Sequence, residues 1–262
     1  MSSDNNQTVY NSAAIARHYA QLQQLQGAEQ VILERLSPQL GQMTMLDLGV
    51  GGGRTTGHFA PLVAQYVGLD YAPAMIAACR ERYSNSPYPL RLEVGDARDL
   101  SRFAAQTFDL ILFSFNGLDY ISHGDRCLAL QEIHRVGKPG GYFCFSSHNL
   151  QGIEPLFRWR NRLRWNPLHN YVETILWALL RSVNRSLTPQ GLTQRDYAII
   201  KDEPHNFQLA NYYIRPLAQL DQLAPNFKAV QIYTWQAGNE ITETEGLLDN
   251  RDLWLYYLCR LR

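Results

Sequence analysis

The feature that most limits the fold is the alternation of strand and helix patterns between residues 43 and 148. Short apolar runs, typical of buried strands, are separated by segments with helical periodicity. The strands are predicted at 43–48, 66–70, 90–94, 108–115 and 142–147, and the helices at 55–64, 74–83 and 126–135. This order predicts an α/β fold with a mostly parallel, doubly wound sheet and helices on both faces.

The segments on either side of this region have a different character. Residues 13–36 show helical periodicity, with a possible break at Gly27, and the helix should stop at Ser37-Pro38. After Asn149 the alternation is lost, because residues 150–194 hold an Arg/Trp-rich stretch and an apolar helix at 171–183 but no good strand. Further elements are predicted as a short strand at 195–201, a helix at 217–223, and antiparallel edge strands at 229–235 and 253–261.

These changes predict four parts in the chain. An N-terminal helical segment at 1–40 should cover the ligand site, and the α/β core should occupy 41–149. A helical cap at 150–215 should lie over the mouth of the sheet, on the acceptor side. Residues 216–262 should add a helix and edge strands that complete the sheet.

Composition and charge exclude several classes of protein. The 262 residues include 24 Lys plus Arg and 24 Asp plus Glu, so bulk positive charge does not favour nucleic-acid binding. The four cysteines are far apart in sequence, which favours reduced thiols in a cytoplasmic protein over a zinc site or disulfides. No signal peptide is recognisable in the polar N-terminus, and no apolar run reaches the ~18 residues of a membrane span.

A glycine-rich turn follows the first predicted strand, in the run Asp47-Leu48-Gly49-Val50-Gly51-Gly52-Gly53-Arg54. Such a turn lets a ligand approach the backbone near the positive end of the next helix. A nicotinamide-binding turn needs G-x-G-x-x-G, and counting from Gly49 places Arg54 where the third glycine belongs. A P-loop needs a Gly-Lys-Ser/Thr sequence, which is missing here.

The turn instead satisfies D-x-G-x-G-x-G, with Asp47, Gly49, Gly51 and Gly53, and resembles the first motif of class I S-adenosylmethionine-dependent methyltransferases. Four later segments resemble motifs of this family in the same order. They are Asp70 to Met75 (D-x-S/A-x-x-M), Gly95-Asp96-Ala97, the fourth strand from Phe108 to Asn116, and Glu132 to Gly141 (E-x-x-R-V-L-K-P-G-G, with Gly137 in place of leucine).

The resemblance implies a seven-stranded sheet and S-adenosylmethionine as cofactor, with S-adenosylhomocysteine as product and no metal. Asp70 would accept hydrogen bonds from the ribose hydroxyls, and Asp96 with the backbone of Ala97 would bind adenine. Met75 would pack near the adenosine, although methionine also fills ordinary core gaps. The candidate cofactor-binding residues are Tyr10, Asp47, Gly49, Gly51, Gly53, Asp70, Tyr71, Met75, Asp96, Ala97 and Asn116.

The acceptor side should be formed by loops, by the N-terminal helix and by the cap. His148 follows the fifth strand and is the candidate general base, with a hydrogen-bonded loop histidine as the alternative. We expect Tyr10 or Tyr19 to contact the cofactor or the acceptor, unless both only pack against the sheet. The candidate acceptor-binding residues are Tyr19, Tyr120, Arg158, His205, Tyr212 and Tyr213.

The predicted activity is methyl transfer to a small or medium organic acceptor, with O-methylation favoured over N-methylation. A carboxyl methyltransferase acting on a metabolite or peptide is one alternative, and a non-catalytic binding module is another. The arginines around Arg158 form a solvated face, recruit an anionic acceptor, or attach the protein peripherally to a membrane. Nucleic-acid methylation is disfavoured, because the fourth strand ends Ser114-Phe115-Asn116-Gly117 and lacks the N/D-P-P-Y/F run.

Overall fold

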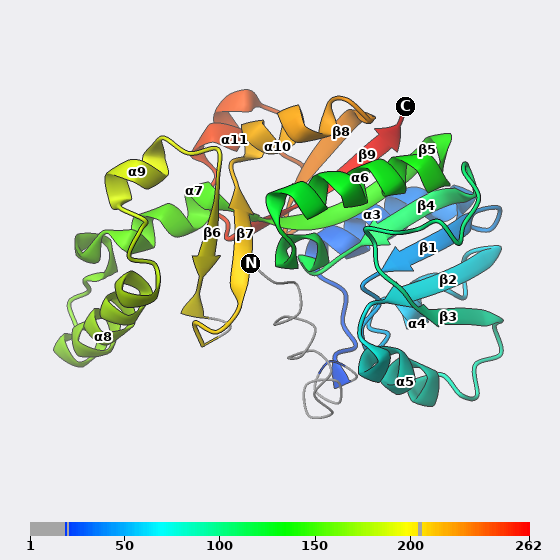
Figure 1. Cartoon of the computed structure of the whole chain (residues 1–262), viewed down its shortest axis with the longest axis horizontal. Helices are drawn as coiled ribbons and strands as arrows, with labels where there is room; N and C mark the ends of the chain where they lie inside the picture. The colour runs from blue at the N-terminus through cyan, green and yellow to red at the C-terminus, as the bar shows by residue number, and fades with distance from the viewer. Residues whose placement is uncertain (1–18, 20, 204–205) are drawn as a thin grey trace.

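The computed structural model describes Tyr19, residues 21–203 and residues 206–262. Within these residues, nine strands form one mixed sheet (Figure 1). The strands are β1 (Thr44–Leu48), β2 (Gln65–Asp70), β3 (Leu90–Val94), β4 (Phe108–Phe113), β5 (Gly137–Asn149), β6 (Tyr197–Lys201), β7 (Ala210–Ile214), β8 (Phe227–Thr234) and β9 (Trp254–Leu261). The helices are α3 (Gly27–Leu40), α4 (Thr56–Phe59), α5 (Pro73–Arg82), α6 (His123–Val136), α7 (Leu150–Ile153), α8 (Pro167–Val183), α9 (Pro189–Thr193), α10 (Pro216–Leu223) and α11 (Thr244–Asp249), with 3-10 turns η1 (Gly117–Tyr120), η2 (Glu154–Phe157) and η3 (Trp159–Arg162).

The central strands confirm the predicted α/β class. Strands β3, β2, β1, β4 and β5 lie side by side and run parallel. Strand β9 runs antiparallel to β5 and to β8, which gives the seven-stranded arrangement β3-β2-β1-β4-β5-β9-β8. The expectation that 253–261 is an edge strand was wrong, because β9 lies between two partners and only β8 is at this edge.

The remaining two strands form a hairpin that extends one side of β5. The last pairing of β4 with β5 joins Phe113 to Phe145, and β5 continues to Asn149. On the side where β4 has ended, the last residues of β5 pair with β7 in parallel, with His148 opposite Tyr213, and β6 then pairs with β7. The hairpin therefore joins residues after the α/β core directly to the end of a central strand.

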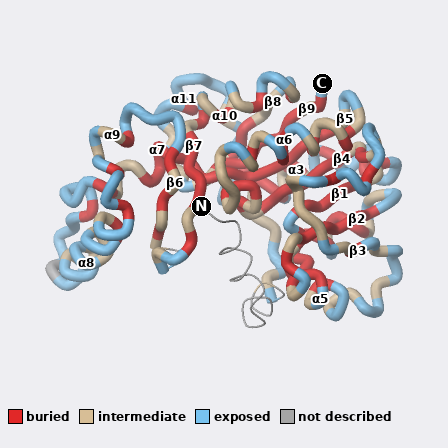
Figure 2. The backbone as a smooth tube through the Cα atoms, viewed as in Figure 1, coloured by how far each residue is buried: buried red, intermediate tan, exposed pale blue. Residues whose placement is uncertain are grey.

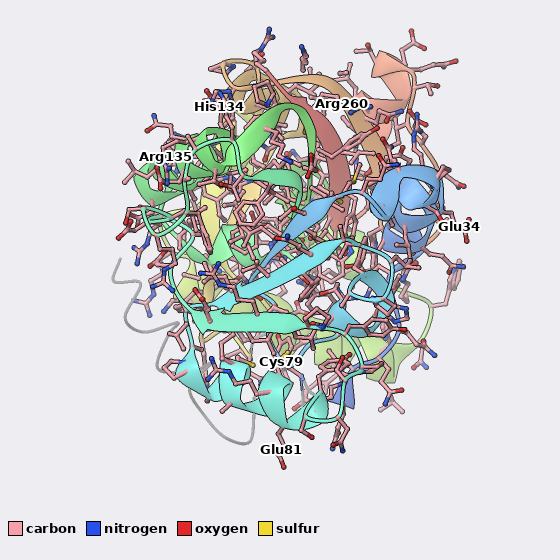
Figure 3. The ribbon with its side chains drawn as sticks, turned by 90° about the vertical axis from the view of Figure 1, so that its right-hand side faces the viewer. Glu34, Cys79, Glu81, His134, Arg135 and Arg260 are labelled. Carbon is pink, nitrogen blue, oxygen red and sulfur yellow. The ribbon has the colours of Figure 1, made fainter. Side chains whose placement is uncertain are left out.

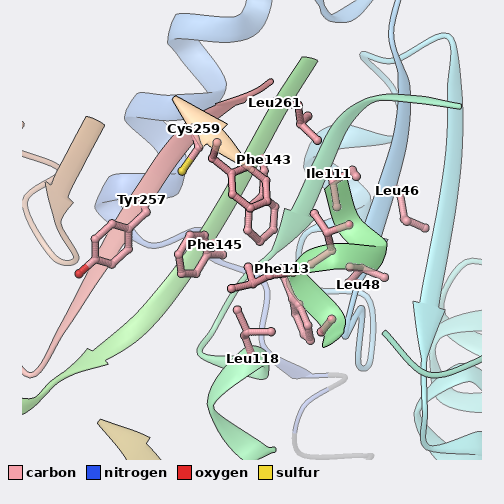
Figure 4. Close-up of a cluster of buried hydrophobic side chains, with 14 of the residues drawn as sticks. Leu46, Leu48, Ile111, Phe113, Leu118, Phe143, Phe145, Tyr257, Cys259 and Leu261 are labelled. Atoms are coloured by element: carbon pink, nitrogen blue, oxygen red, sulfur yellow. The ribbon is translucent and has the colours of Figure 1, made fainter. Parts of the chain in front are cut away.

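The core fills both faces of the sheet (Figure 2). One face carries a stack of aromatic rings, in which Phe143 lies 4.8 Å from Phe145 and Phe145 lies 5.0 Å from Tyr257 (Figure 4). On the other face, Cys79 points from α5 toward the sheet while Glu81 points to solvent (Figure 3). Strands buried on both faces are apolar almost throughout, which explains why the central ones are recognisable in the sequence.

Two helix predictions needed correction. Helix α3 begins at Gly27, where the sequence allowed a break, but it continues to Leu40, so the stop predicted at Ser37-Pro38 was wrong and these residues lie inside its last turns. The ring of Pro38 fits helical φ and removes only one hydrogen bond near the helix end. Helix α4 has four residues and ends before Pro61, which has no N–H to extend it.

All four cysteines are free thiols, and three of them are buried. Among the described residues, no helix is both long enough and apolar enough to cross a membrane.

Candidate functional site

A cavity lies at the carboxyl ends of the parallel strands, where α/β sheets bind ligands. The glycine turn after β1 forms one wall, and the segments after β2, β3 and β4 form the others. Ten predicted site residues line it: Tyr19, Asp47, Gly49, Gly51, Asp70, Tyr71, Met75, Asp96, Ala97 and Tyr120. The lining does not include Gly53, Asn116, His148, Arg158, Tyr212 or Tyr213. Tyr10 and His205 lie outside the described residues.

The glycines of the turn have two different roles. Gly49, Gly51 and Gly53 all have positive φ, at 62°, 55° and 83°, which disfavours any other residue. A Cβ on Gly53 would lie 2.6 Å from the ring of Tyr83, so this glycine allows close internal packing. A Cβ on Gly51 would come no closer than 3.9 Å to another atom, so the cavity has open room beside Gly51 that a ligand can occupy.

The side chain of Asp47 holds the start of the glycine turn in place through hydrogen bonds. Its carboxylate is buried and accepts hydrogen bonds from the Thr55 hydroxyl at 2.5 Å and the Tyr66 hydroxyl at 2.6 Å. Burial raises the pKa of Asp47 to about 6, although these two hydrogen bonds favour the ionised form. The side chain thereby ties β1 to β2 and to the start of α4.

Asp70 ends β2 with its carboxylate at the cavity wall. One oxygen accepts the Gly51 N–H and the other accepts the Ala72 N–H, both at 2.9 Å. Burial raises the pKa of Asp70 to about 6, although the two backbone N–H donors lower it. A carboxylate oxygen can accept two hydrogen bonds, so each oxygen still has room for a hydroxyl donor such as those of a ribose.

Asp96, which follows β3, forms an ion pair with Arg98. Its oxygens accept bonds from the backbone N–H of Arg98 at 2.9 Å and from the guanidinium of Arg98 at 2.6–3.0 Å. Burial raises the pKa of Asp96, but Arg98 outweighs this effect and holds the pKa below its usual value. An adenine amino group could reach this carboxylate only if the Arg98 side chain moved away.

A buried ion pair that the sequence analysis missed joins the turn to α3. The two terminal nitrogens of Arg54 bond the two oxygens of Glu29, each at 2.5 Å, and Glu29 also caps its own helix through the Gln26 N–H. The Ser114 hydroxyl donates to Glu29 as well. Burial lowers the pKa of Arg54, but Glu29 outweighs this and leaves it above its usual value. The residue that replaces the third glycine of a nicotinamide turn therefore anchors the N-terminal helix to the cavity.

His148 is not part of the cavity lining and lies in a buried polar network. Its backbone N–H and its Nδ1 contact the same oxygen of Asp119, at 2.7 and 2.8 Å. Asp119 is fully buried and also binds Arg126 and the Ser147 hydroxyl. A carboxylate only accepts hydrogen bonds, so the proton of a neutral His148 belongs on Nδ1 and leaves Nε2 as an acceptor.

Asn116 connects this histidine to the cavity wall. Its Nδ2 lies 3.2 Å from Nε2 of His148, and its Oδ1 is buried without a partner among the described residues. The neighbours Phe115 and Gly117 both line the cavity. Phe115 and Asn116 have φ of 57° and 60°, an uncommon conformation for non-glycine residues that is often found at functional sites.

The predicted acceptor residues that the structure describes fall into three groups. Tyr19 and Tyr120 line the cavity. Tyr212 and Tyr213 are buried in β7, where the Tyr212 hydroxyl contacts His123 Nδ1 at 2.7 Å and the Tyr213 hydroxyl donates to Asp202 at 2.6 Å. Arg158 is exposed in the segment after β5 and makes no ion pair with a described residue.

Comparison with known proteins assigns this arrangement to a family. Residues 45–141 match the family model described as a methyltransferase domain. These residues contain the glycine turn, Asp70 and Asp96. Residues 45–141 form a methyltransferase domain, and their fold is that of S-adenosylmethionine-dependent methyltransferases.

Solved structures support this fold for the methyltransferase domain and for most of the chain. A S-adenosylmethionine-dependent methyltransferase from Mesorhizobium loti superposes with a TM-score of 0.58 at 19% identity, covering 89% of this chain and 97% of that one.

Two curated relatives are similar to the methyltransferase domain over shorter stretches. Demethylmenaquinone methyltransferase from Corynebacterium kroppenstedtii is 38% identical over 108 residues, which are 41% of this chain and 42% of that protein. Ubiquinone biosynthesis O-methyltransferase from Cereibacter sphaeroides is 29% identical over 127 residues, 45% of this chain and 49% of that protein. The chain thus matches less than half the length of each of these two relatives.

The position of Asp70 leads to a binding prediction. Asp70→Ala is expected to weaken S-adenosylhomocysteine binding by about 1–3 kcal/mol, because it removes charge-assisted hydrogen bonds to the ligand. Calorimetric titration of wild type and variant measures this difference. Asp99→Ala, at an exposed carboxylate outside the cavity lining, is the matched control and should bind normally. Equal affinity of wild type and Asp70→Ala would refute the ribose assignment.

The raised pKa of Asp70 leads to a pH prediction. The ribose hydroxyls of the ligand would donate to the ionised form of the Asp70 carboxylate, whose pKa is about 6 in the structure. S-adenosylhomocysteine affinity should therefore be constant above pH 6 and fall below it, approaching about tenfold per pH unit. Calorimetry between pH 5 and pH 8 tests this, with Asp70→Asn as the reference that cannot ionise. A slope at acid pH that Asp70→Asn retains in full would assign the effect to another group.

Proposed function

We propose that the protein binds S-adenosylmethionine in this cavity and transfers its methyl group to a small or medium organic acceptor, with O-methylation favoured. The observation that carries the proposal is the pairing of Asp70, which keeps free acceptor capacity on both oxygens, with the open room beside Gly51. S-adenosylmethionine supplies an electrophilic methyl group, so the chain has to bind, orient and shield its ligands.

The aromatic part of the cavity supports a flat, largely apolar acceptor. The rings of Tyr19, Phe113, Phe115 and Tyr120 line it together with Ile121. Aromatic side chains bury large apolar area and pack well against other rings. The names of the two curated relatives point to quinone biosynthesis, which is compatible with a ring-bearing acceptor.

His148 is proposed as the general base for an acceptor hydroxyl. Asp119 orients its ring and leaves Nε2 unprotonated, which is the state a base needs. When Nε2 takes a proton, the Asn116 amide can turn its unpartnered Oδ1 toward the imidazolium. Because the Asn116 amide occupies Nε2 of His148, the acceptor hydroxyl must displace this amide before it can pass its proton to Nε2.

We also propose that residues 150–215 form the cap on the acceptor side. The hairpin β6–β7 extends β5 at His148, and Leu209 packs in one apolar cluster with Met75 and Tyr19. This contact, just before β7 begins, supports the position proposed for the cap. The exposed position of Arg158 gives no support to the alternative of a carboxylate acceptor held by the arginines.

The first experiment is calorimetric titration with S-adenosylhomocysteine, with NAD as the parallel control. Binding of the first ligand alone supports the cofactor assignment, and its absence favours a non-catalytic binding module. Transfer of labelled methyl groups is then assayed with phenols, quinols, amines and carboxylic acids. A base-labile label identifies a methyl ester and overturns O-methylation of a hydroxyl. A base-stable label excludes the ester, and labelling of the phenols or quinols but not of the amines then supports transfer to a hydroxyl.

A further inference from the structure

Helix α8 is apolar on two faces, and only one of them packs against the protein. The inner face contributes Leu180 to a buried cluster, and Trp177 donates its indole N–H to the Phe157 carbonyl at 3.0 Å. The outer face carries apolar residues at helical spacing with large exposed fractions. They are Leu168 at 78%, Tyr171 at 69%, Val172 at 52%, Ile175 at 44%, Leu179 at 43% and Val183 at 41%. A continuous exposed apolar stripe of this kind marks an interaction surface.

The segment before α8 adds aromatic rings beside this stripe. Trp165 is fully exposed and Trp159 is 41% exposed. The Asn170 side chain bonds both the backbone N–H and the carbonyl of Arg164, at 2.7 and 2.8 Å. These two bonds hold the loop that carries Trp165 next to the first turn of α8. The helix itself lies at the end of the molecule opposite β2 and β3, where nothing described covers its outer face (Figures 1 and 2).

The charge around the stripe is strongly positive. Residues 158–185 contain six arginines and a single acid, Glu173. Glu173 is bound by the buried Arg162, which also binds Glu203. Arg158, Arg160, Arg164 and Arg185 are exposed. The apolar stripe is therefore flanked by exposed arginines that form no ion pair with any acid among the described residues.

We propose that the outer face of α8, together with Trp159, Trp165 and the exposed arginines, docks on an anionic lipid bilayer. Apolar residues of an amphipathic helix insert at the boundary between headgroups and acyl chains, Trp and Tyr prefer that depth, and arginines attract anionic headgroups. Pairing of this face with a second copy of the chain would bring two groups of arginines together, which is electrostatically unfavourable. The proposal is independent of the methyl-transfer reaction.

Co-sedimentation with large unilamellar vesicles tests the proposal on the full chain. We expect binding to an equal mixture of phosphatidylglycerol and phosphatidylcholine, weaker binding to phosphatidylcholine alone, and loss of affinity at high salt. Ile175→Asp should lower the partition coefficient by about tenfold or more, and Arg160→Gln and Arg164→Gln by about fivefold each. Circular dichroism of each variant verifies that α8 and the fold are retained.

Matched controls separate this face from general surface effects. Leu128→Asp replaces an apolar residue that is 51% exposed on α6, and Lys228→Gln removes an exposed cation on β8, so neither should change vesicle binding. A blue shift of tryptophan emission on vesicle addition, reduced in Trp165→Phe, would support insertion at this site.

Three results would overturn the proposal. The first is no binding to either vesicle composition. The second is binding that Ile175→Asp and the arginine variants leave unchanged. The third is a dimer in light scattering that Ile175→Asp dissociates in a protein that binds no vesicles, because a second copy would then be the partner of this face.

Discussion

Glu29→Ala is expected to lower the free energy of unfolding by about 3–5 kcal/mol. The carboxylate of Glu29 is 1% exposed and bonds both terminal nitrogens of Arg54. Its removal leaves the Arg54 guanidinium charged in a buried site, where an unpaired charge is costly. The Gln26 N–H at the start of α3 also loses its acceptor. Equilibrium denaturation with urea measures the difference.

Two further variants show whether the ion pair between Glu29 and Arg54 causes this loss of stability. Glu34→Ala on the same helix removes an exposed carboxylate and should change stability by less than about 0.5 kcal/mol. The double variant Glu29→Met, Arg54→Met removes both charges and should recover much of the loss, because no buried charge remains unpaired. If Glu29→Ala were as stable as Glu34→Ala, the pair would not anchor α3 to the glycine turn.

The parallel half of the sheet was predictable because its signals are local. Strands such as β3 and β4 are short apolar runs bounded by turns, and their order with α5 and α6 dictates a right-handed parallel arrangement. Strand β7 was missed, because the polar residues of Asn211-Tyr212-Tyr213 suggested a site. In the structure these side chains are buried, with Asn211 and Tyr213 bound to Asp202. A segment with these polar groups can be a buried strand only because Asp202, from another part of the fold, accepts their hydrogen bonds.

The cofactor side of the site follows from motif spacing, whereas the acceptor side does not. Asp70, the last residue of β2, comes nineteen positions after Gly51. The parallel register of β1 with β2 makes the two residues neighbours at one edge of the sheet. Arg54 was interpreted only as the residue that excludes a nicotinamide turn. Its role depends on Glu29, which is 25 positions away in sequence and lies on a different element, helix α3.

His148→Gln is expected to reduce kcat by about 10²–10⁴-fold with an accepted hydroxyl substrate, while S-adenosylhomocysteine affinity stays near the wild-type value. The general base supplies its effect only while the acceptor loses its proton, and His148 is absent from the residues that line the cofactor cavity. Asp119→Asn should lower kcat as well, because the amide no longer fixes the proton on Nδ1. Initial rates at saturating acceptor and separate ligand titrations measure the two effects.

His134→Gln is the matched control, since His134 on α6 packs against Phe227 away from the cavity. A kcat for His148→Gln within about threefold of this control would remove His148 from the reaction, because a missing base costs far more than a packing change. A carboxylic acid acceptor is ionised before it binds and needs no base. Equal sensitivity of phenol and carboxylate acceptors to His148→Gln would therefore assign the residue to maintaining the buried network around Asp119 and Arg126.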